Sequence, residues 1–510
     1  MTSRVLGVVR EQVLAAYFGA GNAMDAYHVA FRIPNLVRDL FAEGAMSSAF
    51  VPTFTRSLTL RGREHAWRLG SNVVSALLVI TGALVVAGIV FAPSIVTLFA
   101  ASYAEVPGKL ELTILLTRIM LPFLALVAVA AAFMGMLNSL RRFFVPAVSP
   151  AMFNVATILC AVFLVPLMPH VGLPGIAAIA IGTLLGGVAQ LGVQWPVLRR
   201  EGFVYRPVLD WRDEGLRRVL ILMGPGTIGL AATQVNVFVN TVLATGEGTG
   251  AVSWLNYAFR LMYLPIGLFG ISVATATLPA VSHDAAQDDS PGVRRTVADG
   301  LSLMMMLNVP ATVGLMVLAA PIVRVIFERG AFTAADTAAT AAALQFYAAG
   351  LVGYSVVRIA SPVFYALGHN RTPVMVSVAT VLVNAALNIA LVGVMGYRGL
   401  ALGTSLAALF NAACLMFFLQ RRLGGIEGKR IESSFLRIAV ASALMGAAAV
   451  AADGAANAWV PGGTVLAQIT RVSMAIAAAV AVLAASAHVL RIREFREGVA
   501  IVTRKLRRSH

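Results

Sequence analysis

Long apolar segments recur from one end of the chain to the other, and this pattern limits the folds available to it. About fourteen such stretches occur, and most reach the ~20 residues that a helix needs to cross a bilayer. They are rich in Ala, Leu and Val and lack the short alternating segments of an outer-membrane barrel. The stretches cover residues 2–18, 23–50, 70–100, 112–137, 144–168, 172–197, 217–245, 250–281, 299–327, 335–367, 373–395, 399–420, 434–456 and 464–490. We therefore predict an all-α polytopic membrane protein with about 14 transmembrane helices.

The composition excludes the other classes of protein. Of the 510 residues, 59% are hydrophobic and only 12% are charged, whereas soluble domains carry about twice that charged fraction. Cys160 and Cys414 both lie inside apolar runs, which indicates neither a disulfide framework nor a metal site. The net charge of +16 is better explained by basic cytoplasmic loops than by nucleic-acid binding, so we expect no nucleic-acid partner.

Basic residues alternate from loop to loop along the chain. If the N-terminus is cytoplasmic, the loops predicted to face outward carry only Lys109, Arg329 and Arg398, and most other loop Lys and Arg residues face inward. The positive-inside rule then predicts a multi-pass protein of the cytoplasmic membrane with both termini in the cytoplasm. The basic segment 491–510 is interpreted as a cytoplasmic tail that faces lipid headgroups.

An internal repeat relates the two halves of the chain. Ala30-Phe31-Arg32 recurs as Ala258-Phe259-Arg260, and the same offset of 228 residues relates Leu40-Phe41 to Leu268-Phe269. An even number of spans per half predicts parallel repeats with a substrate cavity between them. We therefore predict an N-terminal lobe over 1–200, a C-terminal lobe over 201–430, and two additional spans over 431–490.

Ionisable residues within the spans are the strongest functional signal, because each costs about 2.5–3.5 kcal/mol on insertion scales. One helical face of about 80° in the second span carries Asp25, His28, Arg32, Asn35, Asp39 and Glu43. The eighth span repeats the pattern with Ser253, Asn256, Tyr257 and Arg260. Arginine offers a planar fork of donors suited to phosphate, so we predict a cavity for an anionic mono- or diphosphate ligand.

Structural ion pairing is the alternative explanation for these charges. Arg4 could neutralise Glu11, and Arg32 could neutralise Asp39, since each pair shares a helix face. Arg10, Arg38 and Arg260, however, have no obvious local partner in the sequence. Arg358 is isolated, and we interpret it as structural or snorkelling.

Catalytic and nucleotide-binding motifs are absent from the sequence, including the Walker A loop, H-E-x-x-H and G-x-S-x-G. The acidic cluster in the loop at Asp284, Asp288 and Asp289 is interpreted as solvated rather than as a metal–diphosphate site. We therefore predict a transporter and not an enzyme, driven by an ion gradient or the membrane potential.

Two long segments resemble the MurJ (MviN) family. The first comprises Ser3-Arg4-Val5-Leu6-Gly7, Arg10-Glu11 and residues 25–52, which include DAYHVAFRIPNLVR and the following LFAEGA; the second comprises Ser253-Trp254, Tyr257-Ala258 and Arg260-Leu261-Met262. A further match is Gly399-Leu400-Ala401-Leu402-Gly403-Thr404-Ser405. The family consists of bacterial lipid II flippases in the MOP exporter superfamily.

The resemblance implies a fold, a substrate and a set of site residues. It implies two six-helix lobes around a cationic cavity, with 431–490 forming a groove for the lipid tail. It implies lipid II and membrane lipids as partners, together with the cell-wall synthesis machinery. Residues required for transport in the family correspond to Arg4, Arg10, Asp25, Arg38 and Arg260, and less decisive positions correspond to Glu11, Asn35, Glu43 and Ser253. Family members usually carry residues before Ser3, which predicts a misplaced start codon or a missing leader.

Sodium is the one ion that the resemblance suggests as a coupling ion. Some relatives bind it at positions that correspond to Asn240, Asn384, Asn388, the Leu400 carbonyl and Thr404. Asn240 stands where those relatives have an acid, and Tyr263 stands where some members have a glutamate. Without a carboxylate we predict a weak sodium site at most, and no other cofactor.

Other functions remain open at this point. The first is a flippase for another lipid-linked oligosaccharide or a drug exporter of the same superfamily. A membrane scaffold without transport activity is the second, and an enzyme acting on polyprenyl phosphates is the third.

Overall fold

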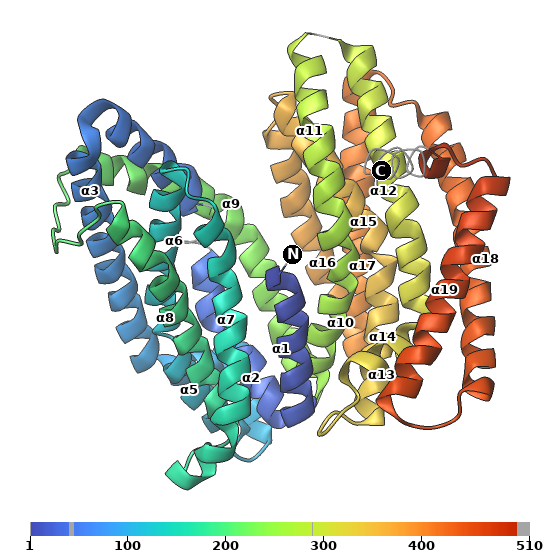
Figure 1. Cartoon of the computed structure of the whole chain (residues 1–510), viewed down its shortest axis with the longest axis horizontal. Helices are drawn as coiled ribbons and strands as arrows, with labels where there is room; N and C mark the ends of the chain where they lie inside the picture. Colours follow the sequence, from blue (N-terminus) through green and yellow to red (C-terminus); the bar gives the residue numbers. More distant parts are fainter. Residues whose placement is uncertain (1, 40–44, 288, 497–510) are drawn as a thin grey trace, which may run out of the picture. The chain divides into compact units, whose positions relative to one another are not determined.

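The computed structural model describes residues 2–39, 45–287 and 289–496, with side chains except those of 2–4, 45, 47–48, 225–232, 268–269 and 271–272. These described residues form helices joined by turns and contain no β-strand (Figure 1). The all-α class is therefore confirmed. Packing divides the chain into two units, which are Met1–Ser253 with Arg329–Thr333, and Trp254–Glu328 with Ala334–His510.

The first unit contains nine α-helices in its described part. They are α1 (Thr2–Phe18), α2 (Asn22–Arg38), α3 (Ala45–Val90), α4 (Ala92–Ala100), α5 (Lys109–Met120), α6 (Phe123–Ser139), α7 (Phe144–Phe163), α8 (Ala177–Arg200) and α9 (Glu214–Thr245), with short helices η2 (Ala101–Glu105) and η3 (Val165–Val171). Helix α1 packs against α7, α2 against α5, and α3 against both α6 and α9. Phe50, Phe54, Phe133 and Phe203 are buried together in the core of this unit.

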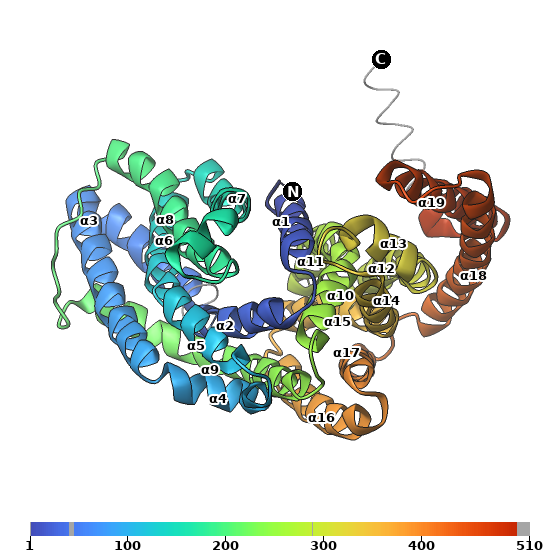
Figure 2. The ribbon, with the colours of Figure 1, turned by 90° about the horizontal axis from the view of Figure 1, so that it is seen from below.

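The second unit contains the remaining helices. They are α10 (Ala251–Pro265), whose first turn belongs to the first unit, η4 (Ile266–Gly270), α11 (Ile271–Ala286), α12 (Ser290–Val317), α13 (Ala319–Phe327), α14 (Ala334–Ala349), α15 (Leu351–Ala366), α16 (Arg371–Met395), α17 (Tyr397–Leu423), α18 (Gly428–Trp459) and α19 (Val465–Val489). Helices α18 and α19 run side by side (Figure 2), and they pack on α12 and α13. Helix α16 packs mainly against α17.

The number of membrane spans differs from a simple count of apolar stretches. In the described residues, nine helices are long and apolar enough to cross a membrane, or ten if α14 and α15, which bend by 40°, form one broken span. Helix α1 has only 17 residues, and the stretch 250–281 is divided among α10, η4 and α11. Breaks of this kind explain why the predicted number of fourteen spans is not confirmed by helix length alone.

Two connecting segments of the first unit make similar contacts at positions 229 residues apart, one residue more than the repeat offset. The Ser102 Oγ donates to the Thr245 carbonyl at the end of α9, at 2.8 Å. The Ala331 N–H donates to the Ala16 carbonyl near the end of α1, also at 2.8 Å. A Cβ on Gly330, which has φ +59°, would lie 2.2 Å from the Ala16 oxygen, so this approach requires glycine. Each half of the repeat thus contributes one loop that holds the first helix of the other half.

The packing units and the predicted lobes end at different residues. The repeat predicts a boundary between 200 and 201, whereas contacts place α9 in the first unit and change unit after Ser253. Helix α9 packs on α3 and α4, which accounts for its assignment to the first unit. The lobes 1–200 and 201–430 and the segment 431–490 remain predictions from the repeat and the resemblance.

Candidate functional site

A fully buried carboxylate, Asp25, lies in the first turn of α2 and accepts four hydrogen bonds. The donors are the backbone N–H groups of Gly250 and Ser253, at 2.7 and 3.0 Å, the Ser253 Oγ at 2.7 Å, and the Lys109 Nζ at 3.0 Å. Gly250 and Ser253 form the N-terminus of α10, where backbone N–H groups lack helical partners and the helix dipole attracts negative charge. Asp25 therefore caps α10 from another helix. We call these four residues the Asp25 cluster.

Two of the predicted site residues meet in this cluster. Asp25 and Ser253 are 228 residues apart, which is the offset of the internal repeat. The neighbouring side chains of Asn22 and Thr249 are also joined, with the Thr249 Oγ1 2.8 Å from the Asn22 Oδ1. The first turns of two repeat-related helices, α2 and α10, thus meet through side-chain hydrogen bonds.

Lys109 is a member of the cluster that the sequence analysis missed, because it placed this residue in an outward-facing loop. The structure instead buries Lys109 as the first residue of α5, with 3% of the residue exposed. Its ammonium lies 4.1 Å from the centre of the Tyr103 ring. Burial raises the pKa of the Tyr103 phenol, and the Asp25 carboxylate raises it further. A cation at a helix N-terminus opposes the helix dipole, and this was the available signal that Lys109 has an acidic partner.

Arg10 forms a buried ion pair with the adjacent Glu11. The Arg10 Nη2 and the Glu11 Oε1 are 2.5 Å apart, and both residues are at most 5% exposed. The Arg10 guanidinium also lies 5.0 Å from the centre of the Phe153 ring. The sequence left Arg10 without a local partner and offered Arg4 as a possible partner of Glu11. Structural pairing therefore explains Arg10 better than expected.

Arg38 pairs with its own neighbour in a more accessible place. Its Nη2 lies 2.7 Å and its Nε 3.1 Å from the Asp39 Oδ1, with the Arg38 side chain 25% and the Asp39 side chain 34% exposed. The Gln234 amide of α9 approaches the other Asp39 oxygen at 3.5 Å. Asp39 thus pairs with Arg38, whereas the sequence had suggested Arg32 as its partner.

The polar face of α2 becomes more exposed to solvent toward the C-terminal end of the helix. Asp25 and His28 are buried, whereas Arg32 and Asn35 are only partly buried. Glu43 lies outside the described residues. Arg4 belongs to α1, and its side chain is likewise outside the described part.

In the second unit, Arg260 is exposed on α10. One turn later on the same helix, the Tyr263 hydroxyl accepts a hydrogen bond from the Arg358 Nη2 of α15. The sequence suggested that Arg358 is isolated, but in the structure it has a partner on α10. Arg260 and Arg358 are both exposed in this unit, and Tyr263 orients the Arg358 guanidinium.

Four of the five positions proposed for sodium are joined in pairs by hydrogen bonds within their own helices. On α16, Asn384 and Asn388 are buried, and their side-chain amides are joined at 3.1 Å. On α17, the Thr404 Oγ1 donates to the Leu400 carbonyl at 2.7 Å. Asn240 belongs to α9 in the first unit. None of the five supplies a carboxylate, so this set does not fit a strong cation site.

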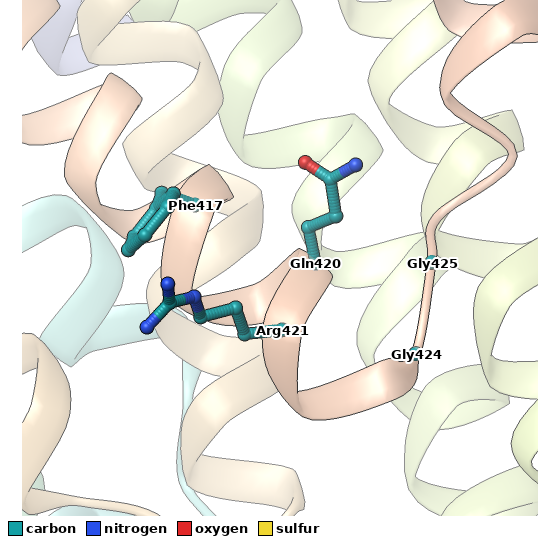
Figure 3. A pocket seen from close by; sticks show the side chains of 5 residues that line it. All are labelled: Phe417, Gln420, Arg421, Gly424 and Gly425. Atoms are coloured by element: carbon teal, nitrogen blue, oxygen red, sulfur yellow. The ribbon is translucent and has the colours of Figure 1, made fainter.

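A separate pocket lies at the C-terminal end of α17 and contains none of the predicted site residues. Phe417, Gln420 and Arg421 project from the helix, and Gly424 and Gly425 begin the linker to α18 (Figure 3). The Arg421 guanidinium lies 4.5 Å from the centre of the Phe417 ring. The Gly425 N–H returns to the Gln420 carbonyl at 2.9 Å, which ends the helix with a C-terminal capping turn. The pocket therefore results from the way in which α17 ends.

Comparison with known proteins identifies one family over most of the chain. The family model described as "Lipid II flippase MurJ" matches residues 14–470. The probable lipid II flippase MurJ of Vibrio cholerae is 36% identical over 424 residues, which cover 81% of this chain and 80% of that protein. The lipid II flippase MurJ of Burkholderia cenocepacia is 35% identical over 426 residues, which cover 83% and 82% of the two chains.

Solved structures agree with this assignment. The structure titled "Lipid II flippase MurJ, inward closed conformation" matches with a TM-score of 0.79 and 26% identity, over 96% of this chain and 97% of that chain. An inward-facing MATE transporter of the MOP superfamily matches with a TM-score of 0.69 and 16% identity, over 83% and 96% of the two chains, which shows a shared fold. The long match to the family model and the identity to curated relatives together show that this chain belongs to the MurJ family.

Proposed function

We propose that this protein moves lipid II from the inner to the outer leaflet of the bacterial cytoplasmic membrane. The observation that carries the proposal is the match to proteins named as lipid II flippases over about four fifths of the chain. Transport changes the position of the substrate and breaks no bond, which agrees with the absence of a catalytic motif from the sequence. The membrane itself and the cell-wall synthesis machinery are the partners expected for such a substrate.

Arg38 is the residue best placed to exchange its partner for a diphosphate. It is partly exposed and is held by Asp39 through two hydrogen bonds to a single oxygen. A diphosphate offers more charge and more acceptor oxygens than one carboxylate, so it competes effectively for the guanidinium fork. Arg260, which is exposed in the second unit, is proposed as the other main contact.

The Asp25 cluster is proposed as one gate of an alternating-access cycle. Asp25 joins α2 to the N-terminus of α10, the helix along which the chain passes from the first unit to the second. Breaking these hydrogen bonds would free one helix from the other. Glu43, at the opposite end of the polar face predicted from the sequence, is the proposed counterpart at the other gate.

The membrane potential is proposed as the driving force. The set of Asn240, Asn384, Asn388, Leu400 and Thr404 offers only neutral oxygens, and four of these residues already hydrogen-bond within the second unit. No step of the proposed cycle therefore requires sodium. Helices α18 and α19 are proposed to hold the lipid tail while the headgroup crosses.

Replacement of a lipid II flippase during its depletion tests the proposal. We expect the wild-type chain to restore growth and the Arg260→Lys variant to fail at normal protein levels, because lysine lacks the bidentate fork. Arg421→Lys, in the pocket that contains no predicted site residue, is the matched control and should restore growth. Failure of the wild-type chain, or full activity of both Arg260→Lys and Arg260→Ala, would contradict the proposal.

A further inference from the structure

We propose that Lys109 is the permanent counterion of Asp25 and that it makes release of α10 from Asp25 energetically accessible. The inference rests on the proposed alternating-access cycle, and it assigns Lys109 the role of a positioning residue rather than a contact for the substrate. It is based on the four hydrogen-bond donors around Asp25, of which three belong to Gly250 and Ser253 at the N-terminus of α10 and the fourth is Lys109.

The two carboxylate oxygens of Asp25 differ in which helices they contact. The Oδ1 accepts both of its hydrogen bonds from Ser253, through the backbone N–H and the hydroxyl. The Oδ2 accepts one from Gly250 and one from Lys109. If α10 leaves, three of the four donors leave with it. Lys109 stays, because α5 packs directly against α2 within the first unit.

Lys109 is held in this place independently of α10. Its ammonium lies over the Tyr103 ring at 4.1 Å, and Tyr103 belongs to η2, immediately before α5. The Lys109 and Asp25 side chains are 2% and 0% exposed. The repeat offset places Ser253 and Thr337 at the positions equivalent to Asp25 and Lys109, so the second half of the chain has neutral residues there. At these two positions the second half therefore has no carboxylate–ammonium pair.

The free energy of a buried carboxylate explains why this addition matters. A buried charge that loses its compensating partners is strongly unfavourable, whereas a buried charge that keeps a hydrogen-bonded counterion is tolerated. Without Lys109, the N-terminus of α10 would be the main compensation for Asp25. The closed arrangement would then be favoured too strongly, and the gate would open rarely.

A disulfide between Asn22→Cys and Thr249→Cys reports this arrangement, because the two native side chains are in contact at 2.8 Å. The background carries Cys160→Ala and Cys414→Ser, which removes both native thiols. After mild oxidation of membranes, the fraction of protein with the disulfide measures the closed arrangement. This measurement needs no lipid II, so it remains informative even if the proposed substrate is wrong.

The proposal predicts opposite effects for the two members of the ion pair. Asp25→Asn should lower the disulfide fraction, because an amide carries no negative charge for the N-terminus of α10 and has one acceptor oxygen in place of two. Lys109→Met should raise it and should also abolish transport. Lys109→Arg, which keeps the charge, should remain near the wild-type fraction. A decrease with Lys109→Met would overturn the proposal, because Lys109 would then only hold Asp25 in position for α10.

The double variant Asp25→Asn, Lys109→Met decides the question if the single Lys109 variant does not accumulate. With the carboxylate gone, no buried negative charge is left for the N-terminus of α10 to compensate, so the double variant should have a lower disulfide fraction than the wild-type chain. A fraction above that of the wild-type chain would show that loss of Lys109 favours the closed arrangement without Asp25, and this would also overturn the proposal.

Discussion

Arginines that look equivalent in the sequence have different physical environments in the structure. Their substitutions should therefore have different effects on stability. Arg10 is buried against Glu11, so Arg10→Ala leaves a buried carboxylate without its nearest cation, at a cost of about 3–5 kcal/mol. Arg38 and Asp39 are partly exposed, so Arg38→Ala should cost less than ~1 kcal/mol. We therefore expect Arg10→Ala to lower the thermal midpoint in detergent strongly and Arg38→Ala to lower it little.

The effects of these substitutions on transport should not follow their effects on stability. Arg38→Ala should abolish complementation while the protein accumulates normally, because it removes a proposed phosphate contact.

The double variant Arg10→Gln, Glu11→Gln should recover part of the midpoint lost in Arg10→Ala, since both charges are removed together. Equal midpoints for Arg10→Ala and Arg38→Ala would show that burial does not distinguish the two pairs.

The sequence singled out several candidate site residues but could not supply their partners. Asp25 and Ser253 stood out because polar groups within apolar spans require an explanation. Lys109 did not, because 84 residues separate it from Asp25 and only the packing of α2 against α5 brings them together. Helical spacing offered Arg4 and Arg32 as structural partners of Glu11 and Asp39, as the alternative to ligand binding. The long side chains of Arg10 and Arg38 instead reach carboxylates at the next position.

At the scale of elements, close packing of α16 against α17 depends on two small residues one helical turn apart, Gly399 and Gly403. A Cβ on Gly403 would lie 2.1 Å from the Asn388 Oδ1, and one on Gly399 would lie 2.3 Å from the Leu391 carbonyl oxygen. Small residues at this spacing let membrane helices approach closely. Gly403→Ala should therefore separate the helices or displace Asn388, and it should lower the thermal midpoint.

Gly393→Ala is the matched control for this prediction. Gly393 lies on α16, and a Cβ there would meet no atom within 4 Å. Alanine also favours a helix over glycine by about 0.8–1.0 kcal/mol. The control should leave the midpoint unchanged or raise it slightly. If Gly403→Ala behaves in the same way, the α16–α17 contact is looser than the structure indicates.

Helices themselves were easier to predict than spans. Each apolar stretch contains helical residues, since a backbone in lipid must satisfy its own hydrogen bonds. The division of 250–281 into α10, η4 and α11 was not predictable from hydropathy, because apolar residues continue across the break. The same holds for α14 and α15, which bend by 40° between Ala349 and Leu351.

At the scale of the whole molecule, the ion pairs restrict how the membrane potential can act. Glu11 and Asp39 neutralise Arg10 and Arg38 locally, so these two arginines contribute little net charge in the arrangement described. Arg260 and Arg358 are exposed on α10 and α15, and we propose that Arg260 carries charge through the field. Each elementary charge that crosses the full potential gains or loses ~2.3 kcal/mol per 100 mV.

We expect transport to depend on the potential and not on sodium. In proteoliposomes or cells, collapse of the potential with the sodium and proton gradients maintained should stop turnover, whereas replacement of sodium by another monovalent cation should not. Arg260→Lys keeps the charge, so the residual activity of this variant should still depend on the potential. Arg260→Gln removes the charge and should weaken that dependence. Transport that continues without a potential and stops when only sodium is removed would show that the neutral oxygens of Asn240, Asn384, Asn388 and Thr404 suffice to bind the ion. In that case the Asn384–Asn388 and Thr404–Leu400 hydrogen bonds would have to rearrange around it, and an inward potential acting on Arg260 would not be the driving force.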